Sequence, residues 1–444
     1  MNAVMEEQDN YLASFGRLEK SLGGREPSWL QALRSASIDR FAELGFPTVR
    51  DEDWRFTNVT PLARVPFQPG RLVDLDSAAR AQVNGLACLA DDVNRLVFVN
   101  GFLAAGLSAL PRLPQGVQAD SMARLWRGHP DNIEPFLGQY AVSEGHAFRS
   151  LNTAFMRDGA YLRVARGVAV EEPIYVVCVT TGESVVAYPR HLVIAESGSA
   201  VTLVEAYVGP GETACLTNAV TEIVVADGAA VDHYKLQREP LSAFHIASLA
   251  VHQQRSSRFS SHNIALGAKL ARNEVNVVLD ALGCECTLNG LYLVAGRQHI
   301  DNRTTIDHAR PHCASHELYK GILDGKAHGV FNGKIFVRQD AQKTDAKQTN
   351  KTLLLSPDAT INTKPQLEIY ADDVKCTHGA TVGQLDPEAL FYLRARGIDM
   401  GSARNLLTFA FANDIVVRIK VGALRQGLEN YLLTARDLPV KEDL

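Results

Sequence analysis

A weak internal repeat is the feature that most constrains how this chain can fold. The segment Leu192–Val204 (LVIAESGSAVTLV) aligns with Glu222–Tyr234 (EIVVADGAAVDHY) at an offset of 30 residues. In each copy an apolar strand meets a small or acidic residue, then a glycine, and then a second alternating strand. Repeats of roughly 20–50 residues are typical of stacked architectures, in which each unit buries its apolar face against the next. The repeat therefore favours a solenoid.

The middle of the chain, from about residue 160 to residue 383, is rich in short β-branched runs and has almost no helical periodicity. Each run is bounded by Gly, Asp, Asn or Ser, which favour turns. A β-sandwich of this length would more often split into two domains, so the pattern favours a β-helix of parallel strands. The predicted strands are Ile174–Val179, Leu192–Ile194, Val201–Val204, Glu222–Val225, Ala247–Val251 and Val275–Leu279.

Helical patterns flank this middle region. Near the N-terminus, apolar residues at helical spacing end at Gly45 and Phe46-Pro47, which form a stop signal, and residues 60–159 have a mixed pattern. The apolar surface expected for the second C-terminal helix is too broad for one packing face, so part of it should meet the solenoid or a partner. The C-terminal signals are Asp386 as an N-cap before Pro387, Gly397 as a stop, Ser402 as a second cap, and a third helix over about Leu424–Leu433.

We therefore expect a mainly β protein in three parts. These are an N-terminal helical and mixed region over 1–159, a parallel β-helix core over 160–383 and a C-terminal helical domain over 384–444.

Charge and hydropathy exclude several classes of function. The chain has 45 Lys and Arg against 50 Asp and Glu, and no basic run, which argues against binding to nucleic acid or to anionic membranes. No apolar stretch reaches the roughly 18 residues of a membrane helix. The start, MNAVMEEQDN, is acidic where a signal peptide would be basic, and the seven cysteines are an odd number, so we expect a cytoplasmic protein without a disulfide framework.

Three motifs have both a functional and a structural interpretation. His308, His312 and His316 recur every fourth residue beside Cys313, but Pro311 disfavours the helix that would bring them to one metal, so histidines in a polar turn are the alternative. The segment Gly329–Ile335 resembles a P-loop but is one residue short and lacks its Ser or Thr. Carboxylates that suggest a carbohydrate-acting β-helix, or merely acidic turns, are Asp340, Asp345, Asp372, Asp373 and Asp386.

Cys376 and His378 form the most informative pair. They are two residues apart at the end of the predicted strand Leu367–Val374, and residues i and i+2 of an extended chain point to the same face. A thiolate beside an imidazole can hold iron or zinc. Two ligands do not complete a site, so the others would come from elsewhere in the chain or from a partner, while a buried cysteine near a chance histidine is the alternative.

Several segments together resemble the SufB/SufD family, the scaffold subunits of the SUF iron–sulfur cluster assembly machine. The resemblance is dense over about 300–420, looser over 160–300 and local in the N-terminal part. The segments are His308–Ser315 (HARPHCAS), Leu318–Leu323 (LYKGIL), Gly329–Ile335 (GVFNGKI), Asp345–Asn350 (DAKQTN), Leu353–Ser356 (LLLS) and Asn362–Ile369 (NTKPQLEI).

Two further segments favour the SufD branch of that family over the SufB branch. Glu52–Asn58 (EDWRFTN) resembles the SufD N-terminal signature. Val374–Gly383 (VKCTHGATVG) resembles the SufD version of a segment that carries an acidic residue beside its histidine in SufB.

This resemblance implies a right-handed parallel β-helix between helical ends, in a complex with SufB and with two copies of the ATPase SufC. It implies no enzymatic activity in this chain, because nucleotide chemistry belongs to SufC. His378, with Cys376 less certainly, would be a transient iron or cluster ligand at the SufB interface, and no cofactor would be tightly bound in the isolated chain. The C-terminal helices would dock SufC through Leu406, Leu407, Phe409 and Phe411.

Two other classes of function are alternatives to this scaffold. One is a polysaccharide-acting enzyme on a β-helix, which would work alone and would more often carry a secretion signal. The other is a homomeric interaction protein without a metal role. The sequence leaves open whether the isolated chain forms a homodimer and which type of cluster is built.

Overall fold

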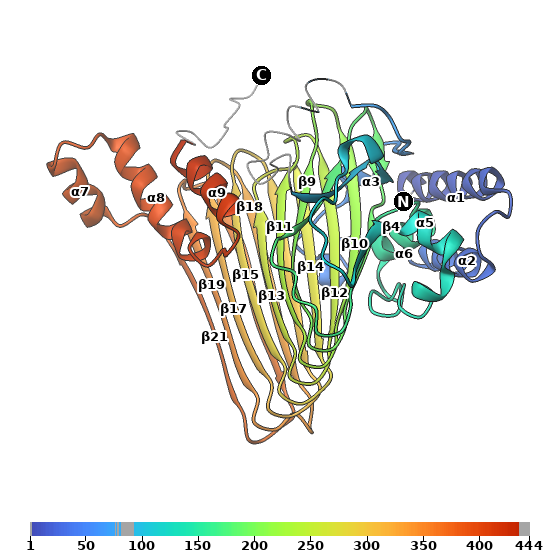
Figure 1. The fold of residues 1–444 in the computed structure, drawn as a ribbon. Coiled ribbons are helices and arrows are strands. Elements are labelled where there is room, and N and C mark those ends of the chain that lie inside the picture. The colour runs from blue at the N-terminus through green and yellow to red at the C-terminus, as the bar shows by residue number, and fades with distance from the viewer. Residues whose placement is uncertain (1, 76, 78–79, 81–92, 435–444) are drawn as a thin grey trace.

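The body of the protein is a β-solenoid of about eight turns, with helices at both ends of the chain (Figure 1). The structure is a computed structural model that describes residues 2–75, 77, 80 and 93–434. It confirms the predicted mainly β class and the parallel β-helix core. The division at residues 159 and 383 stays a prediction, although β2 (Asn94–Val99), from the N-terminal part, already pairs in parallel with β6 (Ile174–Val179) of the core.

Two sheets face each other across the inside of the solenoid, and from β8 to β21 successive strands alternate between them (Figure 1). Sheet A contains β1 (Gln68–Pro69), β4 (Val117–Ser121), β5 (Ala160–Val164), β7 (Val185–Ala187), β8 (Arg190–Ala195), β10 (Cys215–Val225), β12 (Phe244–Gln253), β14 (Leu270–Leu279), β16 (His299–His308), β18 (His328–Val337) and β20 (Thr360–Ile369). Sheet B contains β2, β3 (Phe102–Leu103), β6, β9 (Ala200–Val208), β11 (Ala230–Arg238), β13 (Arg258–Ala265), β15 (Glu285–Val294), β17 (Ala314–Leu323), β19 (Asp345–Leu354) and β21 (Lys375–Gly383).

The repeat found in the sequence is the register of the coils. Leu192 of β8 pairs with Glu222 of β10, and Val204 of β9 pairs with Tyr234 of β11, each at the predicted offset of 30 residues. Because side chains alternate across a strand, in-register stacking sends the same alternate positions of every coil inward. A continuous apolar cluster results, which includes Val225, Val251 and Val277 of sheet A.

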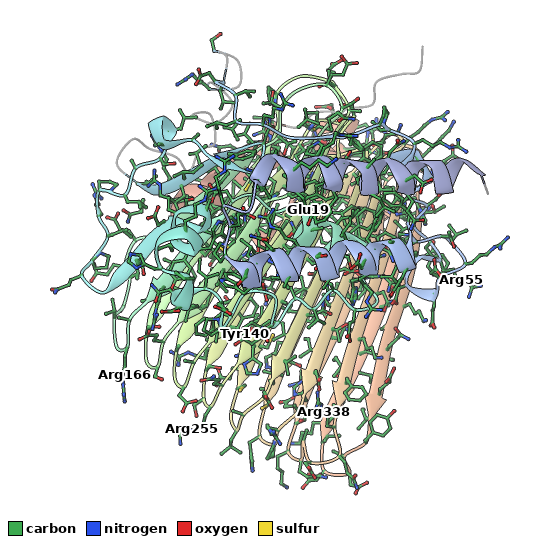
Figure 2. The ribbon with its side chains drawn as sticks, turned by 90° about the vertical axis from the view of Figure 1, so that its right-hand side faces the viewer. Glu19, Arg55, Tyr140, Arg166, Arg255 and Arg338 are labelled. Carbon is green, nitrogen blue, oxygen red and sulfur yellow. The ribbon has the colours of Figure 1, made fainter. Side chains whose placement is uncertain are left out.

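The N-terminal helices cover the outer face of sheet A (Figure 2). Phe15 and Phe41 belong to the same buried cluster as Leu216, Phe244 and Leu270, which point outward from β10, β12 and β14. Gly45, with φ of 65°, ends the second helix at the predicted stop signal. The helices of this region are α1 (Asn2–Leu22), α2 (Ser28–Leu44), α3 (Thr60–Ala63), α5 (Met122–Gly128) and α6 (Ala147–Phe155), with short 3-10 turns at Glu52–Trp54, Ala105–Leu107 and Pro130–Asn132.

The C-terminal helices are α7 (Pro387–Ala395), α8 (Met400–Val416) and α9 (Gly422–Thr434). Helices α8 and α9 pack on the outer face of sheet B, while α7 projects from the body (Figure 1). The predicted cap at Asp386 is confirmed, since its Oδ1 accepts the Glu388 N–H at 2.9 Å. The predicted cap at Ser402 is wrong: Asp399 caps α8 by accepting the Ser402 N–H at 3.0 Å, which places Ser402 inside the first turn.

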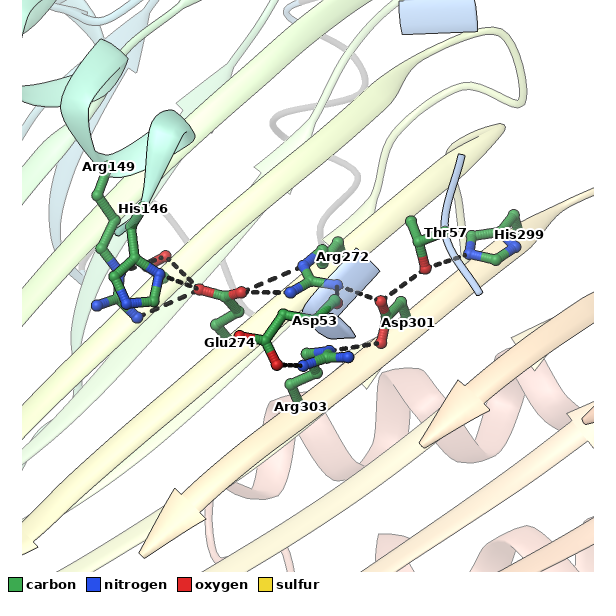
Figure 3. Close-up of polar contacts among 10 residues, drawn as sticks. Asp53, Thr57, His146, Arg149, Arg272, Glu274, His299, Asp301 and Arg303 are labelled. Carbon is green, nitrogen blue, oxygen red and sulfur yellow. Dashed lines mark hydrogen bonds and ion pairs between the residues drawn. The ribbon is translucent and has the colours of Figure 1, made fainter. Parts of the chain in front are cut away.

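A network of charged side chains, buried around Arg272 and exposed at Asp53, holds the segment Glu52–Asn58 on the outer face of sheet A (Figure 3). Arg272 on β14 lies at its centre and contacts Asp301 on β16 at 2.5 Å and Glu274 at 2.6 Å. Arg272 also donates to the backbone oxygen of Asp53 at 2.9 Å, and its guanidinium carbon lies 3.7 Å from the centroid of the Trp54 ring. One arginine thus joins two coils to the N-terminal segment.

Further contacts of the same segment extend across later coils. The Asp53 carboxylate pairs with Arg303 at 2.5 Å, and the Thr57 hydroxyl donates to Asp301 at 2.6 Å. Glu52 reaches Lys364 on β20 at 2.9 Å. The segment therefore spans four strands of sheet A, from β14 to β20, through side chains about 220 to 310 residues away in sequence.

Replacing Arg272 with Met should lower the free energy of unfolding by about 3–5 kcal/mol, because buried Asp301 would lose its 2.5 Å ion pair and keep only Arg303, 3.7 Å away. Chemical denaturation of both proteins measures the difference. The matched control is Arg338→Met, which removes an ion pair with Asp307 at 2.6 Å from an arginine that is 54% exposed, and should cost less than about 1 kcal/mol. Equal losses in the two variants would contradict a central role for Arg272.

Candidate functional site

The last coil of the solenoid is open. Strand β20 ends sheet A and β21 ends sheet B, so among the described strands each has a hydrogen-bonded neighbour on one side only. Edge strands present unpaired N–H and C=O groups on which another chain can add a strand. Apolar side chains are exposed around these edges, since Tyr370 is 60% and Val382 48% exposed. This end of the molecule therefore has the properties of a docking surface.

Cys376 and His378 lie in this open coil, near the start of β21. Their Cα partners in the preceding coil are Ala346 and Gln348. Cys376 packs against the inner cluster that contains Ala346, and His378, two residues further on, faces the same side but is exposed. The predicted shared face is confirmed. The predicted strand Leu367–Val374 is wrong, because β20 ends at Ile369 and the turn that contains Asp372 and Asp373 separates it from β21.

This pair is an incomplete ligand set. Among the described residues, no group of three or more His, Cys, Asp or Glu side chains could hold a metal ion. Burial, helped by the nearby Asp345 carboxylate, raises the pKa of the Cys376 thiol above its usual value. The thiol is therefore protonated at neutral pH, and a metal would have to displace its proton. Two donors at an open edge fit a site completed by another chain.

Behind His378, polar side chains replace apolar ones inside the solenoid. Glu317 on β17 and Gln348 on β19 occupy the same register position as His378 in the two preceding coils. The Gln348 Nε2 donates to the Glu317 Oε2 at 2.7 Å, and both residues are buried. Burial raises the pKa of Glu317 to about 7, although hydrogen bonds from Thr304 and Gln348 oppose this shift. Sequence reasoning missed both residues; the signal was a charged residue at an inward position of strand Ala314–Leu323.

The other candidate motifs are not brought together. His308 is buried and its Nε2 lies 2.8 Å from the Ser315 hydroxyl, whereas His312 lies in a turn with φ of 58° and His316 is exposed on β17. The Cys313 thiol donates to the Ala281 carbonyl at 3.2 Å. The segment Gly329–Ile335 lies within strand β18, so it is not a phosphate-binding loop before a helix. Among the carboxylates, Asp373 pairs with Lys343 and Asp386 caps α7.

The C-terminal surface differs from its prediction in detail. Phe409 and Phe411 pack against the cluster on the outer face of sheet B, and Lys320 of β17 donates to the Phe411 carbonyl at 2.8 Å. Leu407 is half-buried and Leu406 is 43% exposed. The largest exposed apolar side chains on these helices are instead Phe391, 75% exposed, and Tyr392, 56% exposed, both on α7, which sequence reasoning missed. The docking role of the four predicted residues stays a prediction.

The structure is that of a β-solenoid protein whose last coil carries Cys376 and His378 on an edge strand. Within the described residues, none of the helices has the length and apolar character to cross a membrane. Residues 178–411 match the family described as "SUF system FeS cluster assembly, SufBD core domain", and residues 5–176 match "SufBD protein N-terminal region". The chain therefore belongs to the SufBD family of iron–sulfur cluster assembly proteins, as a SufD homologue.

Curated relatives align over most of their length. An iron–sulfur cluster assembly SufBD family protein of Synechocystis sp. is 36% identical, over 92% of this chain and 91% of its own. The iron–sulfur cluster assembly protein SufD of Escherichia coli is 32% identical, over 88% of this chain and 89% of its own. The chloroplastic protein ABCI7 of Arabidopsis thaliana is 30% identical, over 94% of this chain and 88% of its own.

Buried Glu317 should make the stability of the protein depend on pH. Its pKa is about 7 in the folded chain against an ordinary 4.5, so the folded chain holds this proton more tightly than the unfolded chain. Its contribution to stability should therefore fall by up to about 3 kcal/mol as the pH rises from about 4.5 to about 7. Denaturation at pH 5 and pH 8 should show this loss in the wild type but not in Glu317→Gln. Parallel pH dependence of the two proteins would contradict the prediction.

Proposed function

We propose that this chain is a non-catalytic scaffold subunit, which docks on a SufB subunit through its open coil and holds iron or a nascent cluster there transiently. The observation that carries the proposal is the half-site of Cys376 and His378 on the edge strand β21. An imidazole and a thiolate suit iron, and two ligands on one subunit leave positions for ligands from another. A shared site can also release its cargo when the subunits move apart.

The open edges support docking through the core. Strands β20 and β21 end the two sheets at the same end of the solenoid. A single partner that docks there could therefore pair with both edge strands. Strand β20 contains Lys364 and Pro365, residue types that commonly protect a sheet edge from unwanted pairing. They favour docking of a specific partner over open-ended stacking of many chains. Without that partner, the same edges are open to a second copy of this chain.

Association with SufC, the ATPase of the family, is the second part of the proposal. In the described residues the P-loop-like segment is a strand, so nucleotide chemistry would come from the partner. Helix α7 projects from the body and exposes Phe391 and Tyr392, while Phe411 is fixed to the solenoid by Lys320. We therefore place the SufC contact on Phe391, Tyr392 and the exposed Leu406, rather than on Phe409 and Phe411.

Replacing His378 with Ala should abolish or sharply reduce the iron and sulfide of the complex purified with SufB and SufC. The mass of the complex and its melting temperature should stay close to those of the wild type, because the imidazole is exposed and forms a small part of an interface that should exceed about 1,000 Å². Cys376→Ala should have a milder effect. Iron, sulfide, mass and melting temperature are measured on the same preparations.

The matched control is Thr377→Ala, on the same strand but on its opposite face, which should retain full iron content. A normal content of iron and sulfide in an intact His378→Ala complex would exclude His378 as a ligand. Loss of the complex itself, before any loss of iron, would instead indicate a packing role.

Replacing Phe391 with Glu should weaken SufC binding by about tenfold or more, because central aromatic residues of an interface often contribute roughly 2 kcal/mol or more. Calorimetric titration of SufC measures the affinity, and circular dichroism checks that the solenoid stays folded. Leu282→Glu is the control, since Leu282 is also exposed, at 49%, but lies in the turn before β15. An affinity equal to that of the wild type would reject the α7 surface.

A further inference from the structure

The ladder formed by Glu317, Gln348 and His378 has a consequence for the candidate ligand. The three residues occupy one register position in three successive coils of sheet B. Neighbouring strands of a sheet lie about 4.8 Å apart, so side chains on the same face at paired positions lie within contact of each other. In the preceding coil, Cys376 faces Ala346 and Ala380 faces Asn350, so Gln348 is the polar side chain paired with His378.

The amide group of Gln348 has a defined orientation. Its Nε2 donates to the Glu317 Oε2 at 2.7 Å, which requires the amide nitrogen to point back toward the earlier coil. Gly333 on the facing sheet A leaves room for this amide, because a Cβ at Gly333 would lie 2.1 Å from Nε2 and 2.8 Å from Cδ of Gln348. Gly333 therefore provides the space for the amide, and the hydrogen bond to Glu317 sets its direction.

This orientation leaves the amide oxygen of Gln348 as an acceptor. The side chain is buried, with 2% exposure, and its Oε1 has no hydrogen-bond partner among the described residues. A buried polar atom without a partner is uncommon in proteins and costs free energy. The next position along the ladder is His378 in the open last coil, whose ring N–H offers this oxygen a donor.

We propose that Gln348 is the positioning residue of His378: its Oε1 accepts the N–H of the imidazole and thereby selects the ring nitrogen that faces iron. This inference rests on the proposed role of His378 as an iron ligand. Histidine ligands commonly donate their second ring N–H to a carbonyl or carboxylate, which sets both the tautomer and the orientation of the ring. An amide oxygen can only accept, so it excludes the opposite tautomer.

The direct test is the tautomer of His378 in the full chain without partners or metal. Nitrogen NMR of a sample with 15N-labelled histidine reports which ring nitrogen carries the proton, and His378→Ala identifies the signal. We expect one fixed neutral tautomer in the wild type and an averaged signal in Gln348→Leu. Averaged shifts in the wild type would overturn the proposal, whether or not Gln348→Leu folds.

The second test measures Fe2+ affinity in the complex with SufB and SufC. Gln348→Leu should weaken it by about 10- to 100-fold, the usual effect of losing such a supporting group. The matched control is Asn350→Leu, which removes another buried inward amide, bonded to Thr363 at 3.0 Å, from a position paired with Ala380. It should keep the wild-type affinity, so a purely structural effect of losing a buried amide would appear in both variants.

The outcomes separate the two proposals. If His378→Ala loses iron while Gln348→Leu keeps both the fixed tautomer and the affinity, Gln348 does not position the ligand and the proposed function stands. If His378→Ala keeps its iron, the proposed ligand role fails, and the tautomer experiment still decides whether Gln348 orients the ring.

Discussion

In-register stacking of parallel coils is the constraint on which the rest of this structure depends. Each residue meets the equivalent residue of the next coil, so a chemical property placed at one position becomes a ladder through the molecule. Apolar ladders build the inner core, and the ladder of Glu317, Gln348 and His378 brings a buried carboxyl into line with an exposed imidazole. The same rule leaves the last coil without a neighbour, because a stack must end, and this unpaired end carries Cys376 and His378.

Helices close the sides of the solenoid but leave that end open. The N-terminal helices cover sheet A and the helices α8 and α9 cover sheet B, each by burying apolar residues that point outward from the strands. The segment Glu52–Asn58 joins the buried ion pairs of Arg272 through the Asp53 backbone oxygen and the Thr57 hydroxyl. Buried ion pairs are costly unless every charge has a partner, so these contacts favour docking of the segment at this place on sheet A. It gives a physical reason for a polar motif that in sequence is only a resemblance.

The two proposed surfaces share one property: each has a feature that another chain would complete. Among the described residues, Cys376 and His378 supply two ligand side chains where a metal needs more. Helix α7, which follows β21 in the chain and projects from the body (Figure 1), exposes the apolar side chains of Phe391 and Tyr392. A partner subunit could complete the ligand set and cover the exposed aromatic side chains. A scaffold that binds cargo only between subunits would have these properties.

The sequence by itself determined the local and periodic features. The offset of 30 residues predicted the register of β8 with β10, the cap at Asp386 predicted the start of α7, and the spacing of Cys376 and His378 predicted their common face. These features depend on backbone preferences and on the alternation of side chains, which act over a few residues. Tertiary structure decided the contacts between distant residues: Asp53 with Arg303, Lys320 with Phe411, and Glu317 with Gln348. Such contacts depend on how coils stack and which helix face turns inward, and no local pattern contains that information.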